Sequence, residues 1–184
     1  MKTLYNSSLG IEYGQFYITP VADDFEEEDD LIPDNAFEEQ ENGLCGAALR
    51  ERIFFVVGIQ NGKIAVDVQL HDSSPEVNDS FEEIVEVSII RAEHKLHLCE
   101  WGWVNTHELD IPAGTYRLRY SIDGFENDYD PDIEDEEYWE SPLPRQKHLI
   151  QIWPSGASED RILKQTTEQA KYWHEEYGER GAES

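Results

Sequence analysis

Alternating carboxylates are the side chains of this chain whose spacing best suits metal chemistry. Asp128, Asp130 and Asp132 form a D-x-D-x-D pattern, and alternate residues of a tight loop can converge on one calcium ion. An EF-hand loop would continue with Gly at position 133 and Glu at position 139, where this chain has Ile133 and Trp139. The pattern therefore predicts, as one alternative, a calcium site without EF-hand geometry. Its further ligands would be Glu134, Asp135, Glu136 and Glu137.

Imidazole and thiol groups give a weaker signal. His97 and Cys99 fall on one face of a predicted strand, with His94 nearby, but a zinc site needs three or four ligands. Cys45 and Cys99 are the two cysteines of the chain, and we expect free thiols in a reducing compartment. The sequence contains no nucleophile elbow, phosphate-binding glycine loop or dinucleotide fingerprint. We therefore expect a protein that is not an enzyme and that, the calcium alternative aside, uses no cofactor.

The net charge of -27 is concentrated in two stretches. Residues 21–42 hold eleven acids and no base, and residues 123–140 hold ten acids and no base. The other 144 residues carry 20 acids and 14 bases, an ordinary balance. Such a field repels nucleic acid and anionic membranes and attracts basic proteins and divalent cations. The sequence thus predicts a basic protein as the partner and no nucleic acid.

Aromatic residues inside the second acidic stretch extend this prediction. Tyr138 and Trp139 are surrounded by carboxylates, and acid around aromatic anchors suits a basic protein surface. Two alternatives remain open, namely that the aromatic pair packs on the body of the protein and that both stretches only provide solubility. The predicted partner-binding residues are Asp23, Asp24, Glu26, Glu27, Glu28, Asp29, Asp30, Glu134, Asp135, Glu136, Glu137, Tyr138 and Trp139.

Hydropathy predicts a cytoplasmic location. No apolar run approaches the roughly 20 residues that a membrane helix requires, and the N-terminal MKTLYNSSLG lacks the apolar core of a signal peptide. We expect a soluble cytoplasmic protein with no membrane partner.

The elements that must carry these residues are mostly strands. Apolar and polar residues alternate from Tyr116 to Asp123, as in a strand with one buried face. Asn61-Gly62 separates two apolar runs and predicts a hairpin with a type I′ turn. Parallel crossovers are not indicated. The sequence therefore predicts a mainly β fold, an antiparallel β-sandwich or open barrel of seven or eight strands with one C-terminal α-helix. The predicted strands are Leu9–Thr19 with a bulge near Gly14, Ile53–Gln60, Lys63–His71, Glu83–Arg91, His94–Trp101, Thr106–Ile111, Tyr116–Asp123 and His148–Trp153.

The predicted helix completes a single domain of residues 1–178, with acidic insertions at 21–42 and 123–140 and a mobile tail at 179–184. Ser158 is its predicted N-cap, apolar residues recur at helical spacing over about 20 residues, and Gly178 ends it. Arg117 and Arg119 lie on the polar face of their strand, where we expect cross-strand ion pairs with acids.

Three pieces of the sequence resemble the competence protein J family. They are Ile11–Phe16 (IEYGQF), the apolar run Ile53–Ile59, and Leu109–Leu118 (LDIPAGTYRL). Members of that family are small inhibitors of a DNA-degrading nuclease, and related sequences occur as immunity proteins beside nuclease toxins. The resemblance implies an immunity or inhibitor protein whose partner is a nuclease or toxin. Both acidic stretches lie outside the matched pieces, so it assigns no residue a role.

Overall fold

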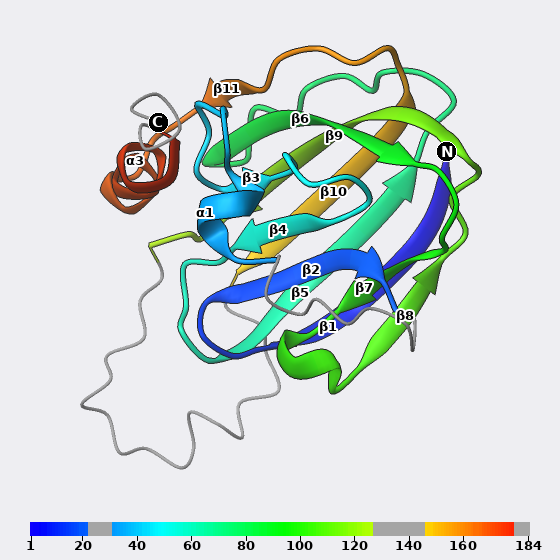
Figure 1. Ribbon diagram of the computed structural model, residues 1–184. Helices are drawn as coiled ribbons and strands as arrows, with labels where there is room; N and C mark the ends of the chain where they lie inside the picture. Colours follow the sequence, from blue (N-terminus) through cyan, green and yellow to red (C-terminus); the bar gives the residue numbers. More distant parts are fainter. Residues whose placement is uncertain (22–30, 127–145, 179–184) are drawn as a thin grey trace.

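The computed structural model describes residues 1–21, 31–126 and 146–178, and this part of the chain forms two packed β-sheets (Figure 1). The mainly β, sandwich-like fold is confirmed, with eleven strands among the described residues where seven or eight were predicted. The six-stranded sheet has the order β1 (Lys2–Ile11), β5 (Gly62–Leu70), β10 (Lys147–Pro154), β9 (Gly114–Asp123), β6 (Glu83–Arg91), β11 (Arg161–Lys164). The five-stranded sheet has the order β3 (Cys45–Gly46), β4 (Ile53–Val56), β2 (Gln15–Pro20), β7 (Leu96–Cys99), β8 (Thr106–Leu109).

The core between the sheets is rich in aromatic rings. Phe16 of β2 and Phe55 of β4 stack at 4.6 Å between ring centroids, and Tyr120 of β9 meets Phe55 edge-on at 4.9 Å. All three rings are buried. Such contacts add about 0.5–1.5 kcal/mol per pair to the stabilisation from burial, so the two sheets are joined through this cluster.

The single strand predicted over Leu9–Thr19 is wrong, because the structure divides it between the two sheets. β1 pairs with β5 and β2 pairs with β4 and β7. Tyr13 and Gly14 connect them with φ of 58° and 68°, and Glu12 bridges to Gln15. Positive φ at both central positions is the signature of a type I′ turn, so a tight turn stands where a bulge was predicted.

The hairpin predicted at Asn61-Gly62 is also wrong. β4 pairs with β2 and β3, whereas β5 pairs with β1 and β10 in the other sheet. Gly62 has φ of 134° and Asn61 does not adopt positive φ, so the turn is not of type I′. Residues 57–61 instead carry the chain from one sheet to the other.

One pair of strands runs parallel, contrary to the expectation that parallel connections are absent. β5 and β10 align from Ala65 with Lys147 to Leu70 with Ile152, and the connection between them contains β6 and β9. β10 is therefore inserted between β5 and β9, and the six-stranded sheet is mixed. Parallel pairing across so long a connection leaves no local pattern in the sequence.

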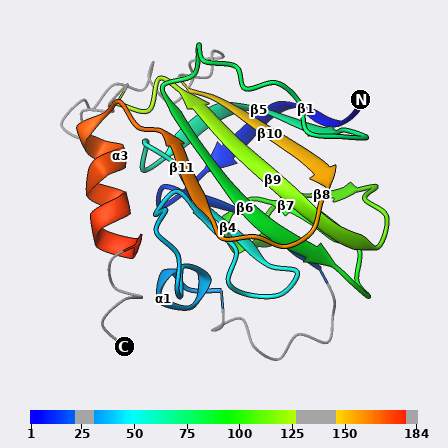
Figure 2. The ribbon, with the colours of Figure 1, turned by 90° about the horizontal axis from the view of Figure 1, so that it is seen from above.

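The C-terminal helix is shorter than predicted and begins elsewhere. Residues 161–164 form β11, and the helix is α3 (Glu168–Trp173), continued by the π-helical turn η3 (His174–Gly178). Its N-cap is Thr167, whose hydroxyl accepts a hydrogen bond from Ala170 N, while Ser158 binds Ser88 instead. η3 extends to Gly178, the last residue of this described range. Figure 2 shows α3 at the side of the sheets, next to β11.

Two short helical elements complete the described residues. They are α1 (Pro33–Ala36) and η2 (Trp101–Trp103). Among the described residues no helix has the length and apolar character needed to cross a membrane.

Candidate functional site

The predicted binding residues lie outside the described part of the chain. These are Asp23, Asp24, Glu26, Glu27, Glu28, Asp29, Asp30, Glu134, Asp135, Glu136, Glu137, Tyr138 and Trp139 for a partner, and Asp128, Asp130 and Asp132 for calcium. The structure does describe the residues that flank both segments. These flanking residues and the surface around them form the candidate site.

Both flanks of segment 127–145 are fixed to one place, which we call the segment base and define as the buried residues Gly58, Phe125 and Gln146 together with the exposed Glu126. The Gln146 side chain is fully buried; it donates to Phe125 O at 3.1 Å and accepts from Gly58 N at 3.3 Å. Phe125 is fully buried as well. The carboxylate of Glu82 accepts from Gly124 N and Phe125 N at 2.9 and 3.1 Å. The residues on both sides of segment 127–145 are thus held by hydrogen bonds, and three of the four residues of the base are buried.

Gly58 is required by this close packing. A Cβ atom at this position would lie 1.9 Å from Phe125 O and 2.5 Å from the Gln146 side chain. Real Cβ atoms do not approach backbone oxygens so closely, so any other residue would force the base apart.

Glu126 connects the base to the C-terminal helix. Its carboxylate accepts hydrogen bonds from Glu168 N and Gln169 N at 2.7 and 3.2 Å. These are amides of the first turn of α3, which have no partner inside the helix. The last described acid before segment 127–145 therefore has a structural role, capping α3.

A buried tyrosine–histidine pair is hydrogen-bonded to the segment base through Gln146. His148 Nε2 lies 3.0 Å from the side-chain Oε1 of Gln146, and His148 Nδ1 lies 2.6 Å from Tyr120 Oη. Burial lowers the pKa of His148 to about 3 and raises the pKa of Tyr120 well above its usual value. The imidazole is therefore neutral, and it donates from Nε2 to Gln146 and accepts at Nδ1 from Tyr120.

Strand register places the segment base at the same end of the sheets as the β1–β2 turn. Lys147 pairs with Asp123 and with Ala65, near the start of β5, and Gly62 pairs with Ile11 at the end of β1. Segment 22–30 leaves from elsewhere, because it follows β2, whose last residue Pro20 pairs with Leu96. The two acidic stretches are thus not rooted in one place.

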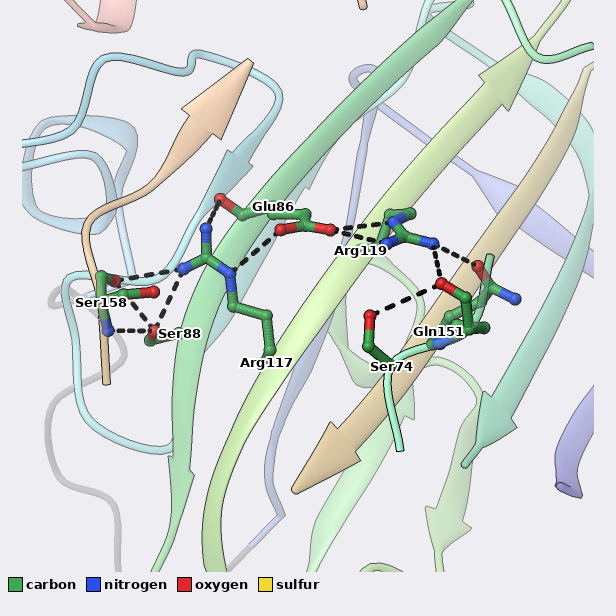
Figure 3. A network of polar contacts seen from close by, with 8 residues as sticks. Ser74, Glu86, Ser88, Arg117, Arg119, Gln151 and Ser158 are labelled. Atoms are coloured by element: carbon green, nitrogen blue, oxygen red, sulfur yellow. Dashed lines mark hydrogen bonds and ion pairs between the residues drawn. The ribbon is translucent and has the colours of Figure 1, made fainter. Parts of the chain in front are cut away.

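The arginines of β9 form the predicted ion pairs but are buried rather than exposed. Figure 3 shows the carboxylate of Glu86 between the two guanidinium groups; Arg119 lies 2.8 Å and Arg117 lies 3.4 Å from its oxygens. Both arginines are 3% exposed. Arg117 also donates to Ser158 O at 3.1 Å and Arg119 to Pro75 O at 3.1 Å. The pairs are hidden because residues 74–76 and 158 cover this face of the sheet.

The ligand types noted in the sequence do not converge in the described residues. His94 binds the carboxylate of Glu51 at 3.0 Å, and Cys45 and Cys99 are free and buried. Within residues 1–21, 31–126 and 146–178, no group of three or more His, Cys, Asp or Glu side chains is placed to hold a metal ion. The calcium prediction concerns Asp128, Asp130 and Asp132, which are outside these ranges.

The described residues form a β-sandwich, and Glu126 and Gln146 of the segment base flank segment 127–145. No family model matches the chain, and no curated protein matches it either. Among solved structures it is similar to ComJ from Bacillus subtilis, an inhibitor of the DNA-degrading activity of NucA, with a TM-score of 0.52 and 21% identity over 84% of this chain and 98% of ComJ. It is also similar to the product of crocagin biosynthetic gene J, with a TM-score of 0.50 and 18% identity over 85% of this chain and 100% of the other. The resemblance to the competence protein J family is confirmed at the level of the fold.

Proposed function

We propose that this chain is a non-catalytic inhibitor that covers the basic, DNA-binding face of a protein such as a nuclease or toxin. The observation that carries the proposal is the segment base, which roots a stretch of eight acids and one base between residues 127 and 145 in buried structure. The similarity to ComJ, itself a nuclease inhibitor, adds support of a second kind.

The mechanism follows from charge and anchoring. Carboxylates of segment 127–145 take the place of DNA phosphates on the partner, and the net charge of -27 steers a basic protein toward them. The fixed base holds the two residues that flank this segment, Glu126 and Gln146, in place before a partner binds. DNA then cannot reach this face of the partner, because the chain occupies it.

Affinity capture from the source cell tests the proposal. The immobilised chain is expected to retain a basic nuclease at low salt and release it as salt is raised, and the free chain is expected to inhibit DNA digestion by that nuclease. If no basic protein is retained, or if digestion continues in the presence of excess chain, the proposal is wrong.

A pair of charge-matched variants separates a specific segment from overall charge. The first converts Glu134, Glu136 and Glu137 to Gln and Asp135 to Asn. The control converts four exposed acids elsewhere, Asp72 and Asp79 to Asn and Glu93 and Glu159 to Gln. Because each variant removes four charges, only the first is expected to lose inhibition.

A further inference from the structure

Two exposed aromatic side chains, Tyr13 and Trp101, lie against each other at the end of the sheets that holds the segment base. Their ring centroids are 4.7 Å apart, and the residues are 62% and 39% exposed. Aromatic rings usually stabilise a fold by burial, yet this pair leaves much of its area in water. We call Tyr13 and Trp101 the aromatic corner.

The backbone at Tyr13 is held in an unfavourable conformation. Its φ is 58°, followed by Gly14 at 68°, and type I′ turns strongly favour Asn-Gly at these two positions. A bulky residue in the left-handed region costs on the order of 1–3 kcal/mol. The turn would form more readily with Asn, so Tyr13 is not explained by the needs of the turn.

The second ring is presented by a loop that is anchored on its other side. Trp103, two residues beyond Trp101, stacks on Tyr17 at 5.8 Å. The carboxylate of Glu100 accepts from Gly10 N and from Asn105 at 2.7 and 2.6 Å, which ties this loop to β1. Trp101 is thus held outward by a fixed loop.

The aromatic corner is adjacent to the segment base through two consecutive residues. Val57 N donates to Gly14 O at 2.8 Å, and the next residue, Gly58, binds Gln146. Glu12 precedes Tyr13 and is exposed. Tyr13, Trp101 and the exposed Glu12 therefore lie at the end of the sheets that also holds Gln146, the residue that follows segment 127–145.

We propose that the aromatic corner binds an arginine side chain of the basic partner, stacked on Tyr13 and Trp101 and paired with Glu12. This inference rests on the proposed function and assigns the described residues that take part in it. A guanidinium group suits the site because it is planar, stacks on aromatic faces and remains charged. The corner supplies the short-range contact, and the acidic segment supplies the long-range attraction.

Three variants of the full chain, titrated by calorimetry with a polyarginine peptide of about ten residues, test this inference. In Tyr13→Asn the ring is removed and the turn is improved, so the chain folds at least as stably, while the Kd is expected to rise roughly two- to fivefold. Tyr13→Phe keeps the ring and is expected to bind like the parent chain. The variant with neutralised residues 134–137, described above, is expected to bind more weakly still.

Salt dependence distinguishes the two contributions. The ratio of the Tyr13→Asn Kd to the parent Kd is expected to be similar at about 50 mM and about 200 mM salt. For the neutralised variant this ratio is expected to fall toward one at the higher salt, because salt screens the charges that the variant lacks. If Tyr13→Asn binds like the parent while the neutralised variant is weakened, the aromatic corner is not a binding site and the proposed function stands. If the parent does not bind, or if neutralisation has no effect, the proposed function fails and this inference with it.

Discussion

Replacement of Glu86 by Gln is expected to destabilise the protein more than the loss of an exposed ion pair would. Glu86 lies between Arg117 and Arg119 (Figure 3), and all three residues are at most 7% exposed. The substitution keeps the shape of the side chain and removes its charge. Two buried guanidinium groups would then have only neutral acceptors, among them Ser158 O and Pro75 O.

The magnitude follows from burial. Removing one partner of a buried ion pair costs about 3–5 kcal/mol, because the remaining charge stays desolvated. For a chain of this length each kcal/mol corresponds to roughly 2–4 °C in Tm, so a fall of about 6–20 °C is expected. An exposed pair is worth under about 1 kcal/mol.

Urea unfolding monitored by circular dichroism measures the effect, with Glu108→Gln as the matched control. Glu108 of β8 pairs at 2.8 Å with Lys95, the residue before β7, but the two side chains are 49% and 65% exposed. A triple variant with Glu86→Leu, Arg117→Leu and Arg119→Met should recover most of the lost stability, since no charge then remains buried. A Glu86→Gln cost equal to that of Glu108→Gln would refute the reasoning.

Three further predictions concern the segment base and its surroundings. Gly58→Ala is expected to lower the free energy of unfolding by about 1–3 kcal/mol because its Cβ would meet Phe125 O; in chemical denaturation, an unchanged midpoint would contradict the packing described. The pKa of His148 is lowered to about 3 in the folded protein from about 6.5 when unfolded, so the unfolded state binds the extra proton and stability falls as pH drops from about 6.5 toward 3. Between pH 5 and 4 this slope should be steeper than in His148→Gln by about 1 kcal/mol per pH unit, and equal slopes would refute it. Finally, if the carboxylates act only as a charged surface, calcium and magnesium should weaken partner capture equally at equal ionic strength; saturable uptake that prefers calcium and is lost in Asp128→Asn would instead favour the calcium alternative.

Local patterns in the sequence predicted most of the strands. Alternation from Tyr116 to Asp123 corresponds to β9, and the runs Glu83–Arg91 and His148–Trp153 correspond to β6 and most of β10. Such patterns are readable because a strand alternates its faces every residue, and this depends only on neighbours along the chain.

Pairing between strands was not readable in the same way. Asn61-Gly62 has the composition of a hairpin turn, but its flanking strands belong to different sheets, and the type I′ turn falls at Tyr13-Gly14 instead. A turn preference is worth little against the burial of two apolar strands, so tertiary packing determined which turn formed. Residues 161–164 have helical spacing in the sequence, but pairing with β6 makes them strand β11.

The candidate site also has features that follow from the sequence and features that follow from tertiary packing. The sequence by itself determined that the fold is mainly β and that the negative charge is concentrated in two stretches, because alternation and charge belong to the residues in order. Only the tertiary structure determined that Gly58, Phe125 and Gln146 meet at the root of one stretch, and that Tyr13 and Trp101 lie beside it. These residues are distant in sequence, and their proximity follows from strand order and register, which the packing of the whole core determines.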